Sequence, residues 1–278
     1  MKKSLTRHWS RRLMTVGAVT ILLLVLALPA FAISYGEPDG NAHPNVGSMV
    51  LSFDGNLFEI CSGTLISDNV FLTASHCTAF MEGFLADNPG AELLVTFDPV
   101  ISESGTFYTG VMHTNPEYLS SNDAADPGDI AVIVLDQEPG IAPASLPTAG
   151  LLDQLKAHHT LKNTRFTAVG YGAIRESKTK GPQNIIDNAE MKRMRAEQGF
   201  LSLTKAWITL SMNVSTGNGG TCYGDSGGPH FIHLNGQETD IVVAVTVTGD
   251  ANCLATDKDY RTDTPQAREF LSQFVTLP

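Results

Sequence analysis

Residues 224–229 read Gly-Asp-Ser-Gly-Gly-Pro, so a single serine lies in a segment where three of six residues are glycine. Glycine permits tight turns and positive φ angles, and it lets the backbone approach a substrate closely. The backbone N–H groups around such a turn can also converge on a developing oxyanion. The segment is therefore a candidate loop for a reactive serine, Ser226, although an ordinary glycine-rich turn has the same composition.

The first 32 residues have the three-part pattern of a secretory signal peptide. Five basic residues and no acidic residue stand at the start, a mostly apolar segment covers 13–28, and Ala30-Phe31-Ala32 is an A-x-A cleavage signal. We expect cleavage after Ala32 and a secreted, extracellular or periplasmic location. The alternatives are a retained membrane anchor and, from Arg11-Arg12, twin-arginine export.

Cleavage leaves 278 − 32 = 246 residues, which suits one large β domain or two small ones that share a core. It also removes five basic residues, so the net charge moves from −11 to −16. An acidic surface argues against nucleic acid and anionic membranes as partners.

The cysteines and histidines give no sign of a metal site. Cys61, Cys77, Cys222 and Cys253 form no C-x-x-C pair, and the histidines are scattered. An even number of cysteines in an exported chain indicates two disulfides with three possible connectivities. We expect no metal and no cofactor.

Short apolar segments separated by turn residues predict a chain made mostly of β-strands. The predicted strands cover 46–51, 63–66, 93–97, 106–109, 130–135, 166–172 and 241–249. A short polar helix is predicted near 151–159, and an amphipathic helix after the N-cap and first-turn proline of Thr264-Pro265. The segment 190–198 carries Lys192, Arg193 and Arg195 and is interpreted as a solvated face.

Two further motifs stand at a distance from the serine loop. Residues 72–77 read Leu-Thr-Ala-Ser-His-Cys, and residues 129–132 read Asp-Ile-Ala-Val. With residues 224–229, they resemble the histidine, aspartate and serine motifs of the chymotrypsin-like (trypsin-fold) serine peptidases, in the order expected for that family. The resemblance covers residues 33–276.

The resemblance implies an all-β fold of two six-stranded antiparallel Greek-key β-barrels packed together, followed by a C-terminal α-helix. Residues 1–32 would be the signal peptide and residues 33–278 the peptidase domain. The first barrel would cover about 33–150, the second about 163–262 and the helix about 264–276.

The family's catalytic roles carry over to His76, Asp129 and Ser226. In the family the histidine accepts the serine proton and the aspartate orients the histidine. The N–H groups of Gly224 and Ser226 would form the oxyanion hole. By residue type alone Asp123 and Asp126 compete with Asp129, and both are interpreted as solvated loop residues.

The resemblance also implies disulfides Cys61–Cys77 and Cys222–Cys253. One departure from the family pattern is Ser75, which stands where the family usually has alanine, one residue before His76. A hydroxyl there can change the local hydrogen bonding.

A third implied feature is activation by a new amino terminus. In the family such an amine pairs with the aspartate before the serine, so that signal cleavage would free Ile33 to pair with Asp225. The enzyme would then become active on export without a separate activating protease.

The resemblance assigns Gly220, Thr221, Thr246, Val247 and Thr248 to the substrate pocket. Gly220 stands at the pocket floor and supplies no carboxylate, so we expect an apolar or small residue before the scissile bond. Asp240 or Asp250 could instead reach the pocket and favour Arg or Lys.

Together these features predict a secreted serine endopeptidase that acts as a monomer on protein or peptide substrates, with no nucleic-acid partner and no membrane contact after cleavage. The alternatives are a non-catalytic binding module on the same fold and an esterase.

Overall fold

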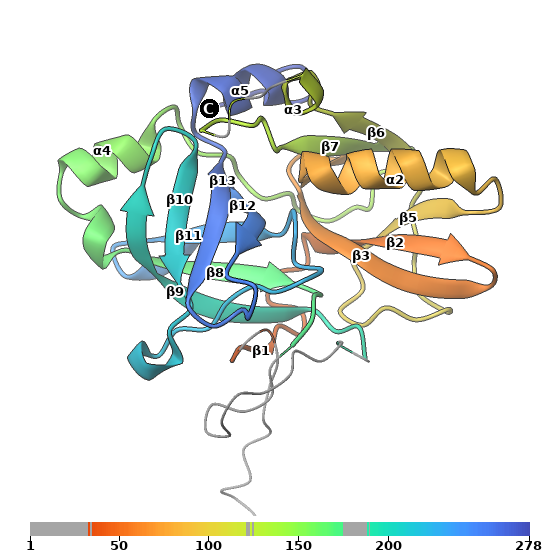
Figure 1. Ribbon diagram of the computed structural model, residues 1–278, viewed down its shortest axis with the longest axis horizontal. Coiled ribbons are helices and arrows are strands. Elements are labelled where there is room, and N and C mark those ends of the chain that lie inside the picture. The colour runs from red at the N-terminus through yellow and green to blue at the C-terminus, as the bar shows by residue number, and fades with distance from the viewer. Residues whose placement is uncertain (1–32, 34, 121–122, 124, 175–187, 189) are drawn as a thin grey trace, which may run out of the picture. The chain divides into compact units, whose positions relative to one another are not determined.

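The computed structural model describes residues 33, 35–120, 123, 125–174, 188 and 190–278. The predicted signal peptide and the segment 175–187 lie outside this set. The described part is mostly β-structure in two antiparallel sheets, with a few helices (Figure 1). No described helix is long and apolar enough to cross a bilayer.

The C-terminal sheet has the strand order β1-β9-β10-β13-β12-β11-β8, and an additional pairing of β9 with β8 closes six of these strands into a barrel. The strands are β1 (Glu37–Pro38), β8 (Arg165–Gly170), β9 (Met194–Leu203), β10 (Trp207–Ser211), β11 (Pro229–Leu234), β12 (Gln237–Gly249) and β13 (Thr256–Arg261). Phe166, Leu210 and Val243 are buried together in one apolar cluster of this sheet.

The N-terminal sheet has six strands in the order β5-β2-β3-β4-β7-β6. They are β2 (Val46–Phe53), β3 (Asn56–Leu65), β4 (Val70–Thr73), β5 (Glu92–Thr96), β6 (Gly110–Thr114) and β7 (Ala131–Leu135). The sheet curls, and a single bridge joins Val95 in β5 to Tyr108, just before β6. The predicted strand at 106–109 is therefore only this bridge.

The predicted fold class is confirmed. One short strand, β1, pairs with the C-terminal sheet although it precedes the N-terminal sheet in the chain. Glu37 and Pro38 in β1 pair with Arg195 and Met194 in β9, so the start of the predicted mature segment belongs to the C-terminal sheet. The predicted assignment of these residues to the first barrel is wrong. Two residues make too short a strand for its sequence to reveal its partner.

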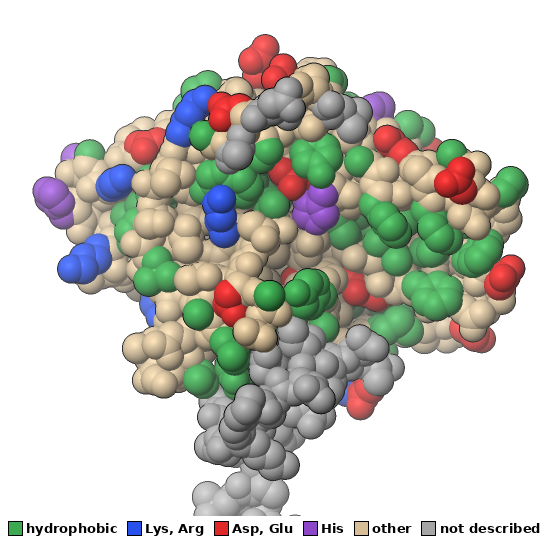
Figure 2. All heavy atoms as spheres, in the orientation of Figure 1, with side chains coloured by type: hydrophobic (Ala, Val, Ile, Leu, Met, Phe, Trp, Pro, Cys, Tyr) green, Lys and Arg blue, Asp and Glu red, His purple; other side chains and the backbone are tan. Residues whose placement is uncertain are grey.

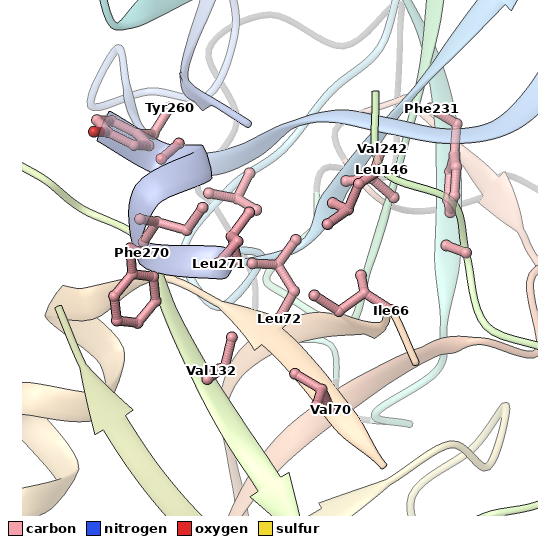
Figure 3. Packing of buried hydrophobic residues seen from close by; sticks show 14 of the residues in the cluster. Ile66, Val70, Leu72, Val132, Leu146, Phe231, Val242, Tyr260, Phe270 and Leu271 are labelled. Carbon is pink, nitrogen blue, oxygen red and sulfur yellow. The ribbon is translucent and has the colours of Figure 1, made fainter. Parts of the chain in front are cut away.

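The two sheets share a hydrophobic core (Figure 3). Leu72 and Val132 come from the N-terminal sheet, Phe231 and Val242 come from the C-terminal sheet, and all four are buried in one cluster. Helix α5 (Pro265–Leu271) packs Phe270 and Leu271 into the same cluster. The helix begins at the predicted N-cap, where the Thr264 hydroxyl accepts a hydrogen bond from the Ala267 N–H.

The other described helices are α2 (Ser75–Asp87), α3 (Pro116–Ser120), α4 (Leu151–Ala157) and the short 3-10 turns η1 (Leu161–Asn163) and η2 (Val214–Thr216). Helix α4 matches the predicted polar helix. Helix α2 has 13 residues and was not predicted. Its apolar and polar residues are poorly segregated, which leaves no clear helical periodicity.

Both disulfides are present with the predicted pairing, Cys61–Cys77 and Cys222–Cys253. The first joins β3 to α2, and the second joins the segment before the serine loop to the β12–β13 connection.

The interpretation of Arg193 as a solvated residue is wrong. The residue is 1% exposed and donates hydrogen bonds to the carbonyl oxygens of Val46 and Phe97 and to the Asp39 carboxylate. Buried carbonyl oxygens need donors, and a guanidinium supplies five N–H groups in several directions. Arg193 is therefore buried because its guanidinium supplies the donors that these carbonyl oxygens need.

Candidate active site

His76 and Asp129 meet because their strands pair. Strands β4 and β7 are antiparallel, with Thr73 opposite Ala131, so the residues after β4 and before β7 lie at the same edge. The His76 N–H donates to Asp129 Oδ1 over 2.9 Å, and His76 Nδ1 lies 2.9 Å from Asp129 Oδ2. Asp129 is buried and His76 is half-buried. The carboxylate thus orients the imidazole ring through Nδ1, and Nε2 stays free to accept a proton.

Ser75 gives this pair a further support. Its hydroxyl donates to the Ile130 carbonyl over 2.8 Å and accepts from the Asn115 N–H over 3.1 Å. The residue before His76 is therefore tied to the residue after Asp129. The departure from the usual alanine adds a buried hydrogen-bond bridge.

The serine loop docks beside the histidine segment. The Ser62 N–H donates to the Ser226 carbonyl over 2.8 Å, and the Cys77 sulfur lies 3.8 Å from the same oxygen. Gly227 is pressed against Thr73 and Ala74, in the segment that leads to His76. No hydrogen bond joins the Ser226 hydroxyl to the His76 ring in the part of the chain that the structure describes. Such contacts are often long without a substrate.

The backbone donors predicted for the oxyanion hole are unengaged. The N–H groups of Asp225, Gly227 and Gly228 donate to carbonyl oxygens, whereas those of Gly224 and Ser226 have no acceptor among the described residues. Gly224 has φ +96°, a conformation that L side chains rarely adopt.

Glu59 lies against this loop, and no sequence motif pointed to it. A Cβ on Gly224 would lie 2.5 Å from Glu59 Oε2, and Glu59 Oε1 is buried without a described hydrogen-bond partner. Burial, together with the charge of Asp225, raises the pKa of Glu59 well above its usual range. An acidic residue between Phe58 and Ile60 in an apolar strand was the only signal in the sequence.

Asp225 is fully buried. Its carboxylate accepts the N–H groups of Gly172 and Cys222 over 2.9 and 2.8 Å, and burial raises its pKa to about 7. Ile33 is also fully buried and packs on Met194. Met194 pairs in register with Gly170, whose Cβ position lies against Asp225 Oδ1. Ile33 and Asp225 are thus each connected to the paired strands β8 and β9, Ile33 through Met194 and Asp225 through Gly170.

The residues assigned to the substrate pocket differ in exposure. Gly220 and Thr221 are buried, Val247 is half-buried and Thr248 is exposed. A Cβ on Gly220 would collide with the Met212 side chain, so this position has no room for a side chain in this conformation. Thr246 turns its hydroxyl toward His230 Nε2, 3.0 Å away in the barrel interior.

The two acidic residues named as alternatives for binding a basic substrate differ in how many hydrogen bonds they already accept. Asp240 accepts the Ser145 hydroxyl, and Asp250 accepts backbone N–H groups of its own turn, including those of Ala255 and Thr256. The charged residue that stands opposite Thr248 in the sheet is a cation, Lys258. Its ammonium lies 4.1 Å from the centre of the Trp207 ring.

Asp126 is not the solvated loop residue that the sequence predicts. It is 2% exposed and accepts the Tyr260 hydroxyl over 2.7 Å. The Lys205 ammonium lies 3.5 Å from its second carboxylate oxygen. Its partner Tyr260 comes from a strand 134 residues later in the chain, which the local sequence could not reveal.

Figure 2 shows the surface of the face drawn in Figure 1. Hydrophobic side chains gather on the half that α2, β2 and β3 occupy, where Phe58 and Phe80 are exposed. Acidic side chains lie on both halves of this face, whereas the basic ones lie mostly on the other half.

A histidine–aspartate pair beside a glycine-rich serine loop, at the junction of two antiparallel β-sheets, defines a protein of the serine-protease type. The family model described as Trypsin matches residues 37–269, and the chain belongs to this family. It is 29% identical over 239 residues to snake venom serine protease PA of Trimeresurus stejnegeri, covering 79% of this chain and 81% of that protein. It is 28% identical over 217 residues to chymotrypsin-like elastase family member 1 of Canis lupus familiaris, covering 73% and 76%.

Among solved structures, HL collagenase superposes with a TM-score of 0.58 at 17% identity and covers 84% of this chain and 94% of that one. At this identity the likeness concerns the fold.

Proposed function

We propose that this chain is a secreted serine endopeptidase that hydrolyses peptide bonds through Ser226, His76 and Asp129. The observation that carries the proposal is the docking of the Ser226 loop on Ser62 and Cys77, next to a histidine whose Nδ1 is held by Asp129. The family match supports the same conclusion. The proposed substrates are proteins or peptides, and the proposed mature enzyme is a monomer.

In the proposed mechanism the Ser226 hydroxyl attacks the scissile carbonyl while His76 Nε2 accepts its proton. Asp129 stabilises the imidazolium that results. The free N–H groups of Gly224 and Ser226 donate to the oxyanion of the tetrahedral intermediate. Collapse of that intermediate expels the amine, which takes the proton from His76 and leaves an acyl-enzyme. Water activated by His76 then hydrolyses the ester and regenerates Ser226.

Activation follows from the fully buried Asp225. In the uncleaved chain Ile33 carries an amide, and the buried carboxylate has only backbone N–H donors among the described residues. Cleavage after Ala32 would convert that amide into an ammonium group close to Asp225. An ionised carboxylate in a buried site is costly without a partner charge, so the new pair would stabilise the serine loop in its active conformation.

The proposed specificity is for an apolar or small residue before the scissile bond. The support is that Gly220 supplies no carboxylate at the proposed pocket floor, and that the Asp250 carboxylate already accepts the backbone N–H groups of Leu254, Ala255 and Thr256. A peptide panel varied at this position tests the preference, and strong Arg or Lys selectivity would overturn it.

The central test is labelling of the secreted chain by a fluorophosphonate, combined with hydrolysis of a matched amide and ester substrate pair. We expect labelling and amide turnover in the unaltered chain. Ser226→Ala should remove labelling and reduce turnover by more than about 10⁴-fold. Ser104→Ala, at an exposed serine, is the control and should retain both.

Each alternative function gives a distinct result. A correctly folded chain without labelling would be a binding module, and a labelled chain that turns over only the ester would be an esterase.

A further inference from the structure

A second group of ionisable side chains lies inside the closed barrel, and the proposed mechanism does not use it. It comprises His230 on β11 and Asp257 and Asp259 on β13, each with 0% of its surface exposed. Gln198 on β9 and Thr246 on β12 complete the group, at 0% and 4% exposed. Four strands thus turn polar side chains into an interior that apolar residues normally fill.

These side chains converge on one point. His230 Nε2 lies 2.9 Å from Asp259 Oδ1 and 3.8 Å from Asp257 Oδ2. The Thr246 hydroxyl is 3.0 Å from the same nitrogen, and Gln198 Nε2 donates to Asp257 Oδ2 over 2.8 Å. One ligand atom from each of His230, Asp257 and Asp259 lies within 4.8 Å of the others.

The group lacks hydrogen-bond partners to an unusual degree. Gln198 Oε1 and His230 Nδ1 are buried without a partner among the described residues. Asp257 Oδ1 and the two oxygens of Asp259 have none there except the neighbouring carboxyl group, and a hydrogen bond between Asp257 and Asp259 requires a proton on one of them. The 2.9 Å approach of His230 Nε2 to Asp259 Oδ1 does not have hydrogen-bond alignment. His230 Nε2 is instead hydrogen-bonded to the Thr246 hydroxyl, 3.0 Å away, so a metal ion at this nitrogen would replace that hydrogen bond.

The charge of this group also favours a bound cation. Two carboxylates share this interior, and in the described chain neither has a Lys or Arg within ion-pair distance. Buried charges are normally paired or coordinate a metal. A divalent cation would balance two carboxylates and a neutral imidazole.

We propose that His230, Asp257 and Asp259 bind a divalent transition-metal ion, with Zn²⁺ as the first candidate. Imidazole and carboxylate ligands suit Zn²⁺, whose bonds to them are about 2.0–2.2 Å long. Tetrahedral geometry then separates the ligand atoms by roughly 3.3–3.6 Å, a range that lies between the two observed separations, 2.9 and 3.8 Å. Thr246 Oγ1, 3.0 Å from His230 Nε2, is the nearest described hydroxyl that could be a fourth ligand after a small shift.

The site would be structural. All its residues are buried, and a closed site without an open position is the form that structural zinc takes. It would join β11, β12 and β13 behind the serine loop, since His230 follows Ser226 by four residues. The inference does not depend on the proposed peptidase activity, and the metal should bind equally well to Ser226→Ala.

The test measures metal in untagged, secreted protein, because a polyhistidine tag would itself bind zinc. We expect about one Zn²⁺ per chain by elemental mass spectrometry. Stripping with a chelator should lower the unfolding temperature, and ZnCl₂ should restore it while MgCl₂ and CaCl₂ do not. Co²⁺ added to the stripped chain should give the visible absorption of a tetrahedral complex, a readout that needs no variant.

Variants locate the site. Asp259→Asn keeps the side-chain shape and should weaken Zn²⁺ binding by more than about 100-fold, since even loss of a residue that only supports a ligand costs about 10–100-fold. Asp126→Asn, at a buried acid outside the group, is the matched control and should bind normally.

Two results would overturn the proposal. One is a chain purified without metal whose unfolding temperature responds neither to chelator nor to Zn²⁺; in that case a proton shared between Asp257 and Asp259 would account for the group. The other is zinc bound with equal affinity by the unaltered chain and Asp259→Asn.

Discussion

At the scale of single residues, the serine loop depends on a glycine that has no room for a side chain. Gly227 has φ +80°, and a Cβ there would collide with Thr73 Oγ1 and lie 2.5 Å from the Ser62 carbonyl oxygen. Gly236, in the β11–β12 turn, has the same φ but no atom within 4 Å of its Cβ position. Comparing substitutions at these two glycines therefore distinguishes the cost of backbone strain from the cost of a steric clash.

Gly236→Ala should lower the free energy of unfolding by about 1–2 kcal/mol, the cost of left-handed backbone alone. Gly227→Ala should lower it by about 2–5 kcal/mol, because overpacking adds to that strain. Urea unfolding measures both, and we also expect Gly227→Ala to lose fluorophosphonate labelling. Equal destabilisation of the two variants would contradict the packing argument.

At the scale of elements, Arg193 joins the segment before β9 to the N-terminal sheet. Its guanidinium donates to the carbonyl oxygens of Val46 in β2 and Phe97 after β5, each over 2.9 Å, and pairs with the buried Asp39. A lysine could not make these bonds in several directions at once.

Arg193→Met should lower the free energy of unfolding by about 3–5 kcal/mol, because it leaves the buried carbonyl oxygens of Val46 and Phe97 without these donors and removes one of the two cations that pair with Asp39. The control is Arg195→Met, two residues further along, where the partly exposed pair with Glu37 should contribute at most about 1 kcal/mol. Denaturant titrations of the two variants test this difference. Similar losses would show that burial of Arg193 is not what matters.

At the scale of the whole molecule, His43 fastens the segment between β1 and β2 to the C-terminal barrel. His43 Nδ1 lies 2.5 Å from Asp39 Oδ1, and Nε2 lies 2.8 Å from Glu238 Oε1 on β12. Burial alone would lower the pKa of His43, but the hydrogen bonds to Asp39 and Glu238 outweigh it and raise the pKa to about 9.

The raised pKa of His43 predicts a stability change with pH. Because the folded pKa lies above the unfolded value of about 6.5, the stabilisation is complete below about pH 6.5 and is lost as pH rises toward about 9. The loss should reach about 3 kcal/mol in the free energy of unfolding. His43→Gln should remove this slope, whereas His158→Gln, at an exposed histidine, should keep it. A slope unchanged in His43→Gln would refute the assignment.

Activity should also be lost at alkaline pH, because the Ile33 α-amine that cleavage would create loses its proton there. An α-amine has a pKa of about 7.7–8.0 in an unfolded chain, and the proposed pairing with Asp225 would raise the folded value. The stabilisation is therefore complete below about pH 7.7 and lost as pH climbs through the folded pKa. Activity should fall reversibly in that range.

N-terminal sequencing of active secreted protein checks the premise, and a start other than Ile33 would refute it. Acetylation of the Ile33 amine should abolish activity at all pH values. An acetylated enzyme with an unchanged alkaline limit would exclude the amine as its cause.

The fold class and about half of the strands followed from local patterns, whereas β4, β6, β10, β11 and β13 were not predicted as strands. Short β-branched segments between turns predicted strands such as β12, and helical spacing after Thr264 predicted α5. Helix α2 was also not predicted, because its apolar and polar residues are weakly segregated; it begins one residue before His76. The pairing of β1 with β9 depends on a partner far along the chain, which no local pattern encodes.

The candidate site was predicted through its motifs and their order, whereas its supports were not. The sequence pointed to His76, Asp129 and Ser226, but not to the bridge from Ser75 to Ile130 or to Glu59 beside Gly224. These contacts depend on strand register and loop docking, so they exist only once both sheets have formed.

The sequence by itself determined the alternation of strands and turns, the supply of cysteines for two disulfides and the glycines that a tight serine loop needs, because these depend on residue type and near neighbours. Only the tertiary structure decided which charges became buried. Arg193 and Asp126 looked like solvated residues, and His230, Asp257 and Asp259 belong to two strands well separated along the chain, yet all five lie in the interior. The reason is that burial is set by which strands pair and which faces turn inward, and these are properties of the assembled sheets.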